Sequence, residues 1–351
     1  MLFIILHLQN QTNKEMKFKT LALLGVFLVH AKFSSAQVPD SIKQHIDTSL
    51  NVLKQHSLYG KKVDWKKIDQ QVYEKANAAK TKSDTFEALK IAFNALGDKH
   101  AQYYQYDHQY RLPNKELEAR QSDSLKAGWK LGARIVNKMI GDVAYLSIPY
   151  MGVSKQADID KYANWIYDAV ADLNKKQPKA WIVDLRLNGG GNIRPMLGGL
   201  GMFFEDCIVS YYVDRDGKTE DEAAFKNGEF TIDGKVQANI KNKIAPIRPK
   251  KIAVLIGPGT GSSGEGVAVV LQQRKGTKLF GTKSAGVANA TNGYVFADDK
   301  AYFLISTASI GNKNKKIMPE FVIPDVEVKQ LESFGNLPED PSVKAAIKWL
   351  K

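Results

Sequence analysis

Residues 179–204 read KAWIVDLRLNGGGNIRPMLGGLGMFF. The apolar, β-rich run 181–183 predicts a buried strand, which breaks at the three glycines 189–191 before helix-compatible residues resume. Three consecutive glycines remove every Cβ, so backbone N–H groups can approach a bound atom closely, as in anion cradles and oxyanion holes. A plain strand-to-helix turn fits the stretch equally well, because glycine is the default turn residue. The rest of the chain has to decide between the two.

The composition is that of a globular protein with a sizeable core. The 351 residues are 44% hydrophobic and 25% charged, which allows one large or two ordinary domains. The first 36 residues contain four lysines and one acidic residue, so the remainder carries +10 of the net charge of +13. This surplus is spread along the chain, often beside acids, so we expect no nucleic-acid partner, whereas a preference for acidic partners or membrane surfaces stays open. Cys207 is the single cysteine, and we interpret it as a small core residue.

Residues 1–36 have the pattern of a secretory signal. From Met16, two lysines precede an apolar run at 21–31, and small residues at 34–36 precede the expected cleavage site. The run is too short to span a bilayer, and no cysteine follows it that could carry a lipid anchor. We therefore expect translation to start at Met16, and the mature protein to be exported, periplasmic or secreted, with no stable membrane span. An uncleaved anchor is the competing interpretation.

Hydrophobic periodicity divides the mature chain into three parts. Residues 37–115 are predicted to be an amino-terminal helical segment, because apolar residues recur at helical spacing and no proline occurs between 40 and 97. Residues 130–335 are predicted to form an α/β domain, and residues 336–351 a carboxyl-terminal helix. Within the α/β domain we expect strands at 133–136, 143–149, 279–281, 294–297 and 301–306, a helix at 157–173, and a polar insertion of strands and loops at 213–251.

A second glycine-rich loop follows another buried strand. Residues 252–256 are apolar and β-rich, residues 257–261 contain three glycines, and a helix is predicted to begin near Ser262. The strand at 143–149, the helix at 157–173 and the strand at 181–183 make a βαβ unit, which implies a parallel sheet. Such sheets bind ligands at the carboxyl ends of their strands, so both glycine loops are predicted to lie at one ligand-binding edge.

Ser262 is the candidate nucleophile. At a strand-to-helix turn, its hydroxyl would lie at a helix amino terminus with the N–H of Ser263 beside it. Developing negative charge on an attacked carbonyl would then meet a free donor and the positive helix end. Ser262 and Glu265 also have the spacing of a capping box, in which the serine only closes the helix, and on its own this motif favours the cap.

A serine hydroxyl needs a base to become a nucleophile. His100 lies in a predicted loop at the end of the helical segment, before an aromatic patch, where a side chain could reach into a cleft. His108 is its nearby competitor. His45 and His56 lie in polar helical sequence and are predicted to face solvent.

Three motifs in this order resemble the tail-specific, or C-terminal processing, serine peptidase family, which includes the tricorn core peptidase. They are D-L-R-x-N-G-G-G at 184–191, G-T-x-S-S-x-E at 259–265 and P-D-V at 324–326. The similarity covers about 142–328, and the L-x-D-x-H segment of some members resembles 96–100. The resemblance implies a crotonase/ClpP-like ββα sheet domain, here with an amino-terminal helical segment. It also implies a peptide or protein substrate, and no metal or organic cofactor.

The resemblance assigns roles to particular residues. It implies that Ser262 is the nucleophile, and that the N–H of Ser263 and that of Gly189 or Gly190 form the oxyanion hole. Better-known members carry a lysine base about twenty-five residues after the serine, but this chain has Val287 there.

The remaining, tricorn-like pattern implies that His100 is the base and that Glu320 supports it, with Lys283 as the reserve base. Only about forty residues separate His100 from the strand at 143–149, too few for the PDZ module of many members. Substrate would then be recognised by the catalytic cleft itself.

The favoured hypothesis is an exported serine peptidase that works without a cofactor. The first alternative is a catalytically silent peptide- or ligand-binding module of the same fold. An acyl-processing enzyme of the related crotonase architecture is a second, although an export signal argues against an intracellular thioester substrate. Phosphate binding at the Gly189 loop lacks the Gly-Lys-Ser/Thr ending of a P-loop.

Overall fold

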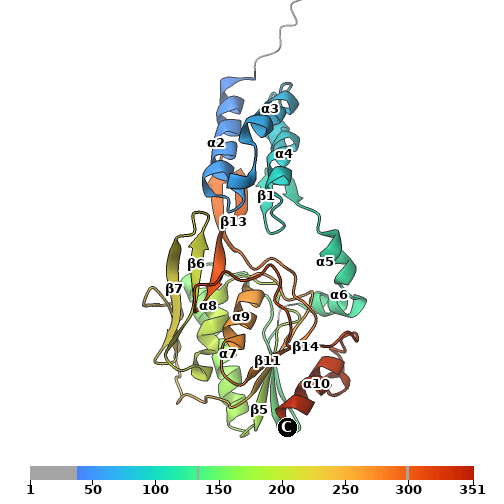
Figure 1. Ribbon diagram of the computed structural model, residues 1–351, viewed down its shortest axis with the longest axis vertical. Coiled ribbons are helices and arrows are strands. Elements are labelled where there is room, and N and C mark those ends of the chain that lie inside the picture. The colour runs from blue at the N-terminus through green and yellow to red at the C-terminus, as the bar shows by residue number, and fades with distance from the viewer. Residues whose placement is uncertain (1–37, 133, 298–299) are drawn as a thin grey trace, which may run out of the picture.

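The computed structural model describes residues 38–132, 134–297 and 300–351. The predicted signal region therefore lies outside the described residues. Figure 1 shows an elongated molecule with the amino-terminal helices at one end and an α/β unit at the other, and strand β13 runs between them. In the described part of the chain, no helix is both long enough and apolar enough to cross a membrane.

The apolar run at 181–183 lies in strand β5, in the middle of a six-stranded sheet with the strand order β14-β11-β10-β5-β4-β3. All neighbouring strands are parallel except the edge pair β3 and β4. Strands β4 and β5 with the helix between them are the βαβ unit that the sequence predicts. The strands are β3 (Val136–Ile140), β4 (Val143–Ser147), β5 (Ala180–Asp184), β10 (Ile252–Ile256), β11 (Thr277–Gly281) and β14 (Val326–Glu327).

Helices cover both faces of this sheet, because β5 is apolar on both sides. Trp181 and Val183 face one core, under α7, α8 and α9, and Ile182 faces the other, under α10. This alternation is the two-residue period of a strand, and burial on both faces explains the continuous apolar run. The elements are α7 (Gln156–Asn174), α8 (Ile193–Gly199), η3 (Gly201–Phe203), α9 (Ser263–Gln272), η4 (Leu337–Glu339) and α10 (Pro341–Leu350).

A second, eight-stranded sheet is antiparallel, in the order β2-β1-β13-β6-β7-β8-β9, with β12 also paired to β13. The first residue of β13, Ala301, pairs with Gln105 of β1, whereas the last, Asn312, pairs with Ser210 of β6. One strand therefore joins the helical end to the α/β unit. The strands are β1 (Gln102–Gln105), β2 (His108–Arg111), β6 (Cys207–Asp214), β7 (Thr219–Lys226), β8 (Glu229–Ile232), β9 (Lys235–Val236), β12 (Ala290–Phe296) and β13 (Ala301–Asn312).

The amino-terminal helices pack around a core of their own, to which β1 and β13 contribute Tyr103 and Phe303. Helix α4 is followed by Gly97, whose φ of +66° is the left-handed conformation that favours glycine at a helix end. The β1–β2 hairpin was not predicted. The elements are α2 (Asp40–His56), η1 (Gly60–Lys62), α3 (Trp65–Lys75), η2 (Ser83–Thr85) and α4 (Phe86–Leu96).

The charged stretch before Lys130 forms two short helices that were not predicted, α5 (Lys115–Arg120) and α6 (Asp123–Lys130). Two sequence interpretations need correction. His45 is buried rather than solvent-facing, with Nε2 3.3 Å from Oε1 of Gln105, because it lies on the inner face of α2. Cys207 is exposed, because β6 begins there before the strand enters the core.

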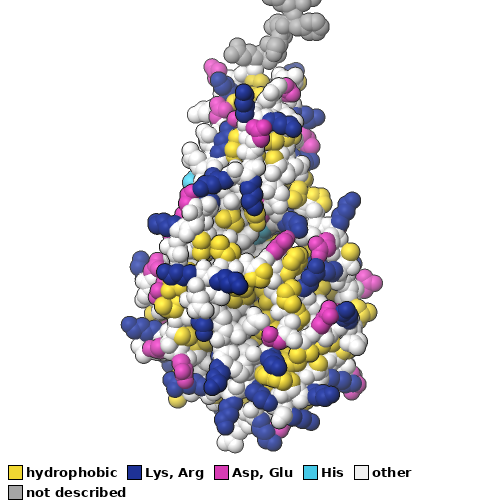
Figure 2. Space-filling view, in the orientation of Figure 1, with side chains coloured by type: hydrophobic (Ala, Val, Ile, Leu, Met, Phe, Trp, Pro, Cys, Tyr) yellow, Lys and Arg dark blue, Asp and Glu magenta, His cyan; other side chains and the backbone are white. Residues whose placement is uncertain are grey.

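Charges of both signs are distributed over the visible surface. On the face drawn in Figure 2, lysines and arginines are scattered among acidic side chains, and apolar side chains gather between them near the middle of the molecule.

Candidate active site

The two glycine-rich loops meet at the carboxyl ends of β5 and β10. The N–H of Gly261 donates to the carbonyl oxygen of Asn188 at 2.9 Å. A Cβ added to Gly190 would lie 2.6 Å from the Cβ of Ser262, closer than real side chains approach. Gly190 also has a φ of +109°, which other residues rarely adopt. The loops can approach this closely only because residue 190 is glycine.

Ser262 lies in a strained conformation at the start of α9. Its φ of +51° and ψ of −121° cost on the order of 1–3 kcal/mol for a residue with a side chain, and such strain clusters at active sites. Ser262 and Glu265 do form the capping box. The N–H of Ser262 donates to Oε2 of Glu265 at 2.8 Å, and the N–H of Glu265 donates to the carbonyl oxygen of Ser262 at 2.9 Å. The Ser262 backbone carries much of the cap, and the side chain lines a cavity of about 1060 Å³.

The loop geometry separates the two glycines proposed for the oxyanion hole. The N–H of Gly190 donates to Oδ1 of Asn188 at 3.0 Å, so it is not free for a substrate. Within the described residues, the N–H groups of Gly189 and Ser263 have no hydrogen-bond partner. The structure therefore leaves Gly189 and Ser263 as donors and removes Gly190.

Glu265 connects the serine loop to the loop after β11. The side chain is fully buried, and its two oxygens accept from Ser262 N–H at 2.8 Å, Gly286 N–H at 2.9 Å, Val287 N–H at 3.0 Å and Ser284 Oγ. Burial raises the pKa of Glu265, and these four hydrogen bonds oppose the rise. The sequence showed Glu265 only as a capping residue, and no sequence signal revealed its contact with the second loop.

Replacing Glu265 with glutamine should lower both activity and stability. Glutamine offers one acceptor oxygen, and its NH2 group would face two of the four donors, leaving buried groups unpaired at about 1–3 kcal/mol each. We expect kcat/KM for peptide hydrolysis to fall roughly ten- to a hundredfold and the Tm to drop by several degrees. Steady-state kinetics and thermal unfolding measure these effects. The exposed Glu118→Gln change on α5 is the matched control, and equal behaviour of the two variants would refute the role.

His100 lies in the loop that follows α4. Buried Asp98 fixes this loop to β13, because its carboxylate accepts from the N–H of Ser306 at 2.9 Å, Ser306 Oγ at 3.0 Å and the N–H of His100 at 3.0 Å. The His100 ring lines a cavity of about 680 Å³, and its buried Nδ1 has no hydrogen-bond partner in the described part of the chain. Burial lowers the pKa of His100, opposed by the charge of Asp98 and the backbone of Asn289. The imidazole is therefore neutral near pH 7 and able to accept a proton.

His100 and Ser262 lie in adjoining cavities. Ala288 and Asn289 line both, so the segment 286–289, which Glu265 binds at Gly286 and Val287, borders both side chains. No hydrogen bond joins the His100 ring to Ser262 Oγ among the residues described. Catalytic hydrogen bonds are often long before substrate binds, so this arrangement keeps His100 as a candidate base.

Glu320 lies near His100 without bonding to its ring. It lines the same cavity, and its Oε1 is 3.1 Å from Nζ of Lys99, the residue before His100. The Glu320 side chain is 56% exposed. The structure thus gives Glu320 an ion pair with the neighbouring lysine and no hydrogen bond to the imidazole in the residues that it describes.

The two alternatives to His100 as the base, Lys283 and His108, make contacts elsewhere. Nζ of Lys283 is 2.6 Å from Oε1 of Glu116 on α5 and 4.4 Å from the ring centre of Phe321. The ring of His108 stacks on Phe86 at 4.8 Å, within the helical end of the molecule. Neither residue lines the cavity at Ser262.

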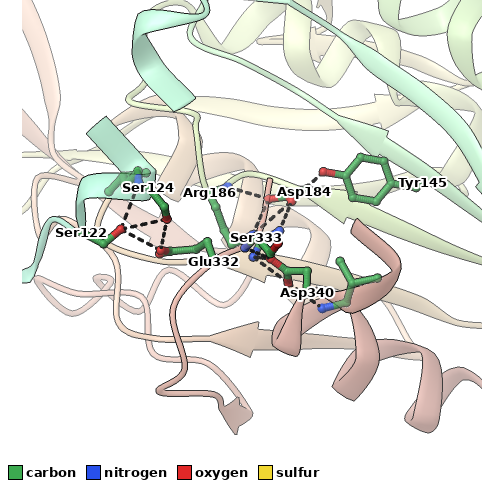
Figure 3. A network of polar contacts seen from close by, with 10 residues as sticks. Ser122, Ser124, Tyr145, Asp184, Arg186, Glu332, Ser333 and Asp340 are labelled. Carbon is green, nitrogen blue, oxygen red and sulfur yellow. Dashed lines mark hydrogen bonds and ion pairs between the residues drawn. The ribbon is translucent and has the colours of Figure 1, made fainter. Parts of the chain in front are cut away.

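A buried ionic network holds the end of β5 just before the first glycine loop (Figure 3). Nη2 of Arg186 is 2.6 Å from Oδ2 of Asp184, and Nη1 donates to both carboxylate oxygens of Asp340 at 2.9 Å. The hydroxyl of Tyr145 donates to Asp184 at 2.8 Å. Asp340 caps α10 through the N–H of Val343 at 3.0 Å, so the network joins the site loop to the carboxyl-terminal helix.

The fold and the paired loops define a class of α/β peptidases. The chain belongs to peptidase family S41, whose pattern matches residues 142–328.

The chain is similar to one known protein along nearly its whole length and to another along only part of that protein. The chain is 28% identical over 339 residues to the nisin-resistance protein of Lactococcus lactis subsp. lactis, covering 93% of this chain and 92% of that protein. It is 24% identical over 176 residues to the carboxy-terminal processing protease CtpA of Bacillus subtilis, covering 50% of this chain and 34% of that protein. A lipoprotein from Streptococcus agalactiae has a similar structure, with a TM-score of 0.64, 19% identity and coverage of 88% of this chain and 96% of that one. This likeness concerns the fold.

Proposed function

We propose that the protein is an exported serine peptidase that hydrolyses peptide bonds through an acyl-enzyme on Ser262. One observation carries this proposal: a strained serine lies where two glycine loops meet, and in these loops the N–H groups of Gly189 and Ser263 have no hydrogen-bond partner among the described residues. Membership of a peptidase family supports a peptide or protein substrate. Export rests on the signal pattern of residues 1–36 and is tested by the amino-terminal sequence of the secreted protein.

In this mechanism, Ser262 Oγ attacks the carbonyl carbon of the scissile peptide bond. His100 takes the hydroxyl proton, and the carbonyl oxygen becomes an oxyanion that the N–H groups of Gly189 and Ser263 stabilise. The protonated imidazole then gives its proton to the leaving amine as the C–N bond breaks. Water, deprotonated by the same imidazole, hydrolyses the acyl ester and restores Ser262. For these steps the His100 ring must come within hydrogen-bond distance of Oγ when substrate binds.

A serine-directed fluorophosphonate tests the nucleophile directly. We expect it to label the mature protein at Ser262, as located by mass spectrometry of the tryptic digest, and to leave Ser262→Ala unlabelled. The control is Ser154→Ala, because Ser154 lines the same cavity without lying at the loop junction. Labelling at another residue would contradict the assignment of Ser262.

Peptide cleavage separates the peptidase from the silent binding module. Mass spectrometry of a peptide library incubated with the protein and with Ser262→Ala should show products only with the former. Binding of peptides without either labelling or cleavage would favour the silent module. Nisin belongs in the library, because the similarity to the nisin-resistance protein covers nearly the whole length of both chains.

A further inference from the structure

A second cavity lies beside the loop that carries Gly189. It has a volume of about 360 Å³, within the usual range for ligand pockets, and Gly189 forms part of its wall. Tyr150 lines both this cavity and the larger one at Ser262, so the two are neighbours. The lining is mostly apolar and includes Trp129, Val136, Pro149, Leu187, Phe334 and Leu337. We call it the Gly189 pocket.

The walls of the Gly189 pocket are fixed to the catalytic loops. A Cβ at Gly259 would lie 2.7 Å from Leu125 Cδ1 and 3.1 Å from the Trp129 ring, so α6 packs tightly on the loop before Ser262. Ser122 and Ser124, at the start of α6, bond to Glu332 at 2.8 and 3.1 Å (Figure 3). Helix α6, which contributes Gly128 and Trp129 to the lining, therefore forms one wall of this pocket.

The rim of the Gly189 pocket is unusually apolar for an exposed surface. Leu131 is 62% exposed, Tyr150 52% and Trp129 36%. Large apolar side chains grouped around a concave site are typical of a surface that a partner covers. The mechanism proposed for Ser262 assigns no role to these three side chains.

Among the residues that the structure describes, Arg134 is the only charged one that lines the Gly189 pocket. In the described part of the chain it has no ion-pair partner, whereas Glu116, Asp184, Glu320 and Asp340 each have one. An exposed guanidinium beside an apolar cavity selects a ligand that is apolar with a carboxylate close by.

We propose that the Gly189 pocket binds a large apolar side chain of the substrate, next to the scissile bond, and that Arg134 pairs with a carboxylate beside that side chain. The inference rests on the proposed function, because it uses Gly189 as the donor to the scissile carbonyl. Because Gly189 both lines the pocket and is the proposed donor to the scissile carbonyl, the occupant lies close to the cleaved bond. The carboxylate is either the free end of the peptide or an acidic side chain.

Peptide binding to the full-length Ser262→Ala variant tests the proposal without catalysis. Fluorescence anisotropy would compare four labelled peptides: one ending in phenylalanine as the free acid, its amide, the amide with aspartate after phenylalanine, and the free acid with serine in place of phenylalanine. We expect the phenylalanine acid to bind tenfold or more tighter than the serine peptide, from apolar burial. Tighter binding of the acid than of both amides assigns the carboxylate to the chain end. Equal binding of the acid and the aspartate amide would mean that either a chain-end carboxylate or an acidic side chain can pair with Arg134. Equal binding of all four peptides overturns the proposal.

Two pairs of variants, in the same Ser262→Ala background, locate the binding site. Val136→Phe should fill the pocket and remove most of the preference for phenylalanine, whereas Val295→Phe, at a 58% exposed position on β12, should not. Arg134→Gln should remove the preference for a carboxylate, whereas Lys138→Gln on β3, also exposed but outside the pocket, should retain it.

The exposed rim provides a variant that does not depend on core packing. Leu131→Asp should weaken phenylalanine-acid binding about tenfold or more, by loss of apolar contact and repulsion of the carboxylate. Unchanged preferences in folded Val136→Phe and in Leu131→Asp overturn the proposal. Fluorophosphonate labelling of the wild-type protein reports the proposed function separately, so a failure of the pocket and a failure of the nucleophile give different results.

Discussion

Replacing His100 with alanine should lower kcat/KM for peptide hydrolysis by about a thousandfold or more, because the serine hydroxyl would then lose its proton acceptor. The change should leave the fold intact, since the contacts that fix the loop come from Asp98 and from the His100 backbone, not from the ring. Cleavage of a fluorogenic peptide, read beside the Tm, measures both effects. His108→Ala is the matched control, because this ring stacks on Phe86 in the helical end.

The pH profile separates a base from a residue that only shapes the cavity. Burial lowers the pKa of His100 below its ordinary 6.5, and the neutral ring is the active form. Wild-type kcat/KM should therefore rise with pH through a value below 6.5 and be level at pH 7, and the His100→Ala enzyme should lack this acidic limb. Normal activity of His100→Ala would assign proton transfer to a different group, and Lys283→Ala would then be measured next.

Strands β5 and β10 and the glycine-rich loops that follow them could be predicted because their sequence signals are local. An apolar run followed by glycines identifies β5 and β10, and a parallel sheet brings their carboxyl ends together. The β1–β2 hairpin has no comparable signal. Strand β1 is half polar, and what stabilises it is the pairing of residues such as Tyr103 with Phe303, two hundred residues later. Tertiary contacts of this length override local propensity.

The details of the site depended on side chains whose partners are distant in sequence. Gly189 and Gly190 are equivalent candidates in the sequence, and the bond from Gly190 N–H to Asn188 Oδ1 is what removes Gly190 as a donor. Glu265 has the spacing of a helix cap, and its contacts with Gly286 and Val287 follow from where β11 ends. Spacing identifies residue types that could do chemistry, whereas the choice between equivalent groups is made by hydrogen bonds.

Replacing Asp340 with alanine should destabilise the protein by about 3–5 kcal/mol, because the change removes one partner of a buried ion pair and leaves the charge of Arg186 undercompensated. Both side chains are at most 2% exposed. The same change removes the cap of α10 and the acceptor for the N–H of Ser333 at 2.7 Å. Urea unfolding at pH 7 measures the free energy. Asp123→Ala is the control, because this exposed aspartate lies 3.6 Å from Lys126, and such pairs contribute less than about 1 kcal/mol.

The pH dependence of stability gives the Asp340 prediction a second readout. Burial acts to raise the pKa of Asp340, but the charge of Arg186 and the backbone hydrogen bonds prevail, so the pKa lies below its ordinary 3.8. A carboxyl whose pKa is lower in the folded state contributes stability above its unfolded pKa and loses it as the pH falls through the folded value. Wild-type stability should therefore decrease below about pH 4 more steeply than that of Asp340→Ala. Parallel curves, or a loss under 1 kcal/mol at pH 7, would mean that the carboxyl-terminal helix does not stabilise the end of β5. Because that strand leads directly into the loop of Gly189, the variant's remaining folded fraction should also label more slowly at Ser262.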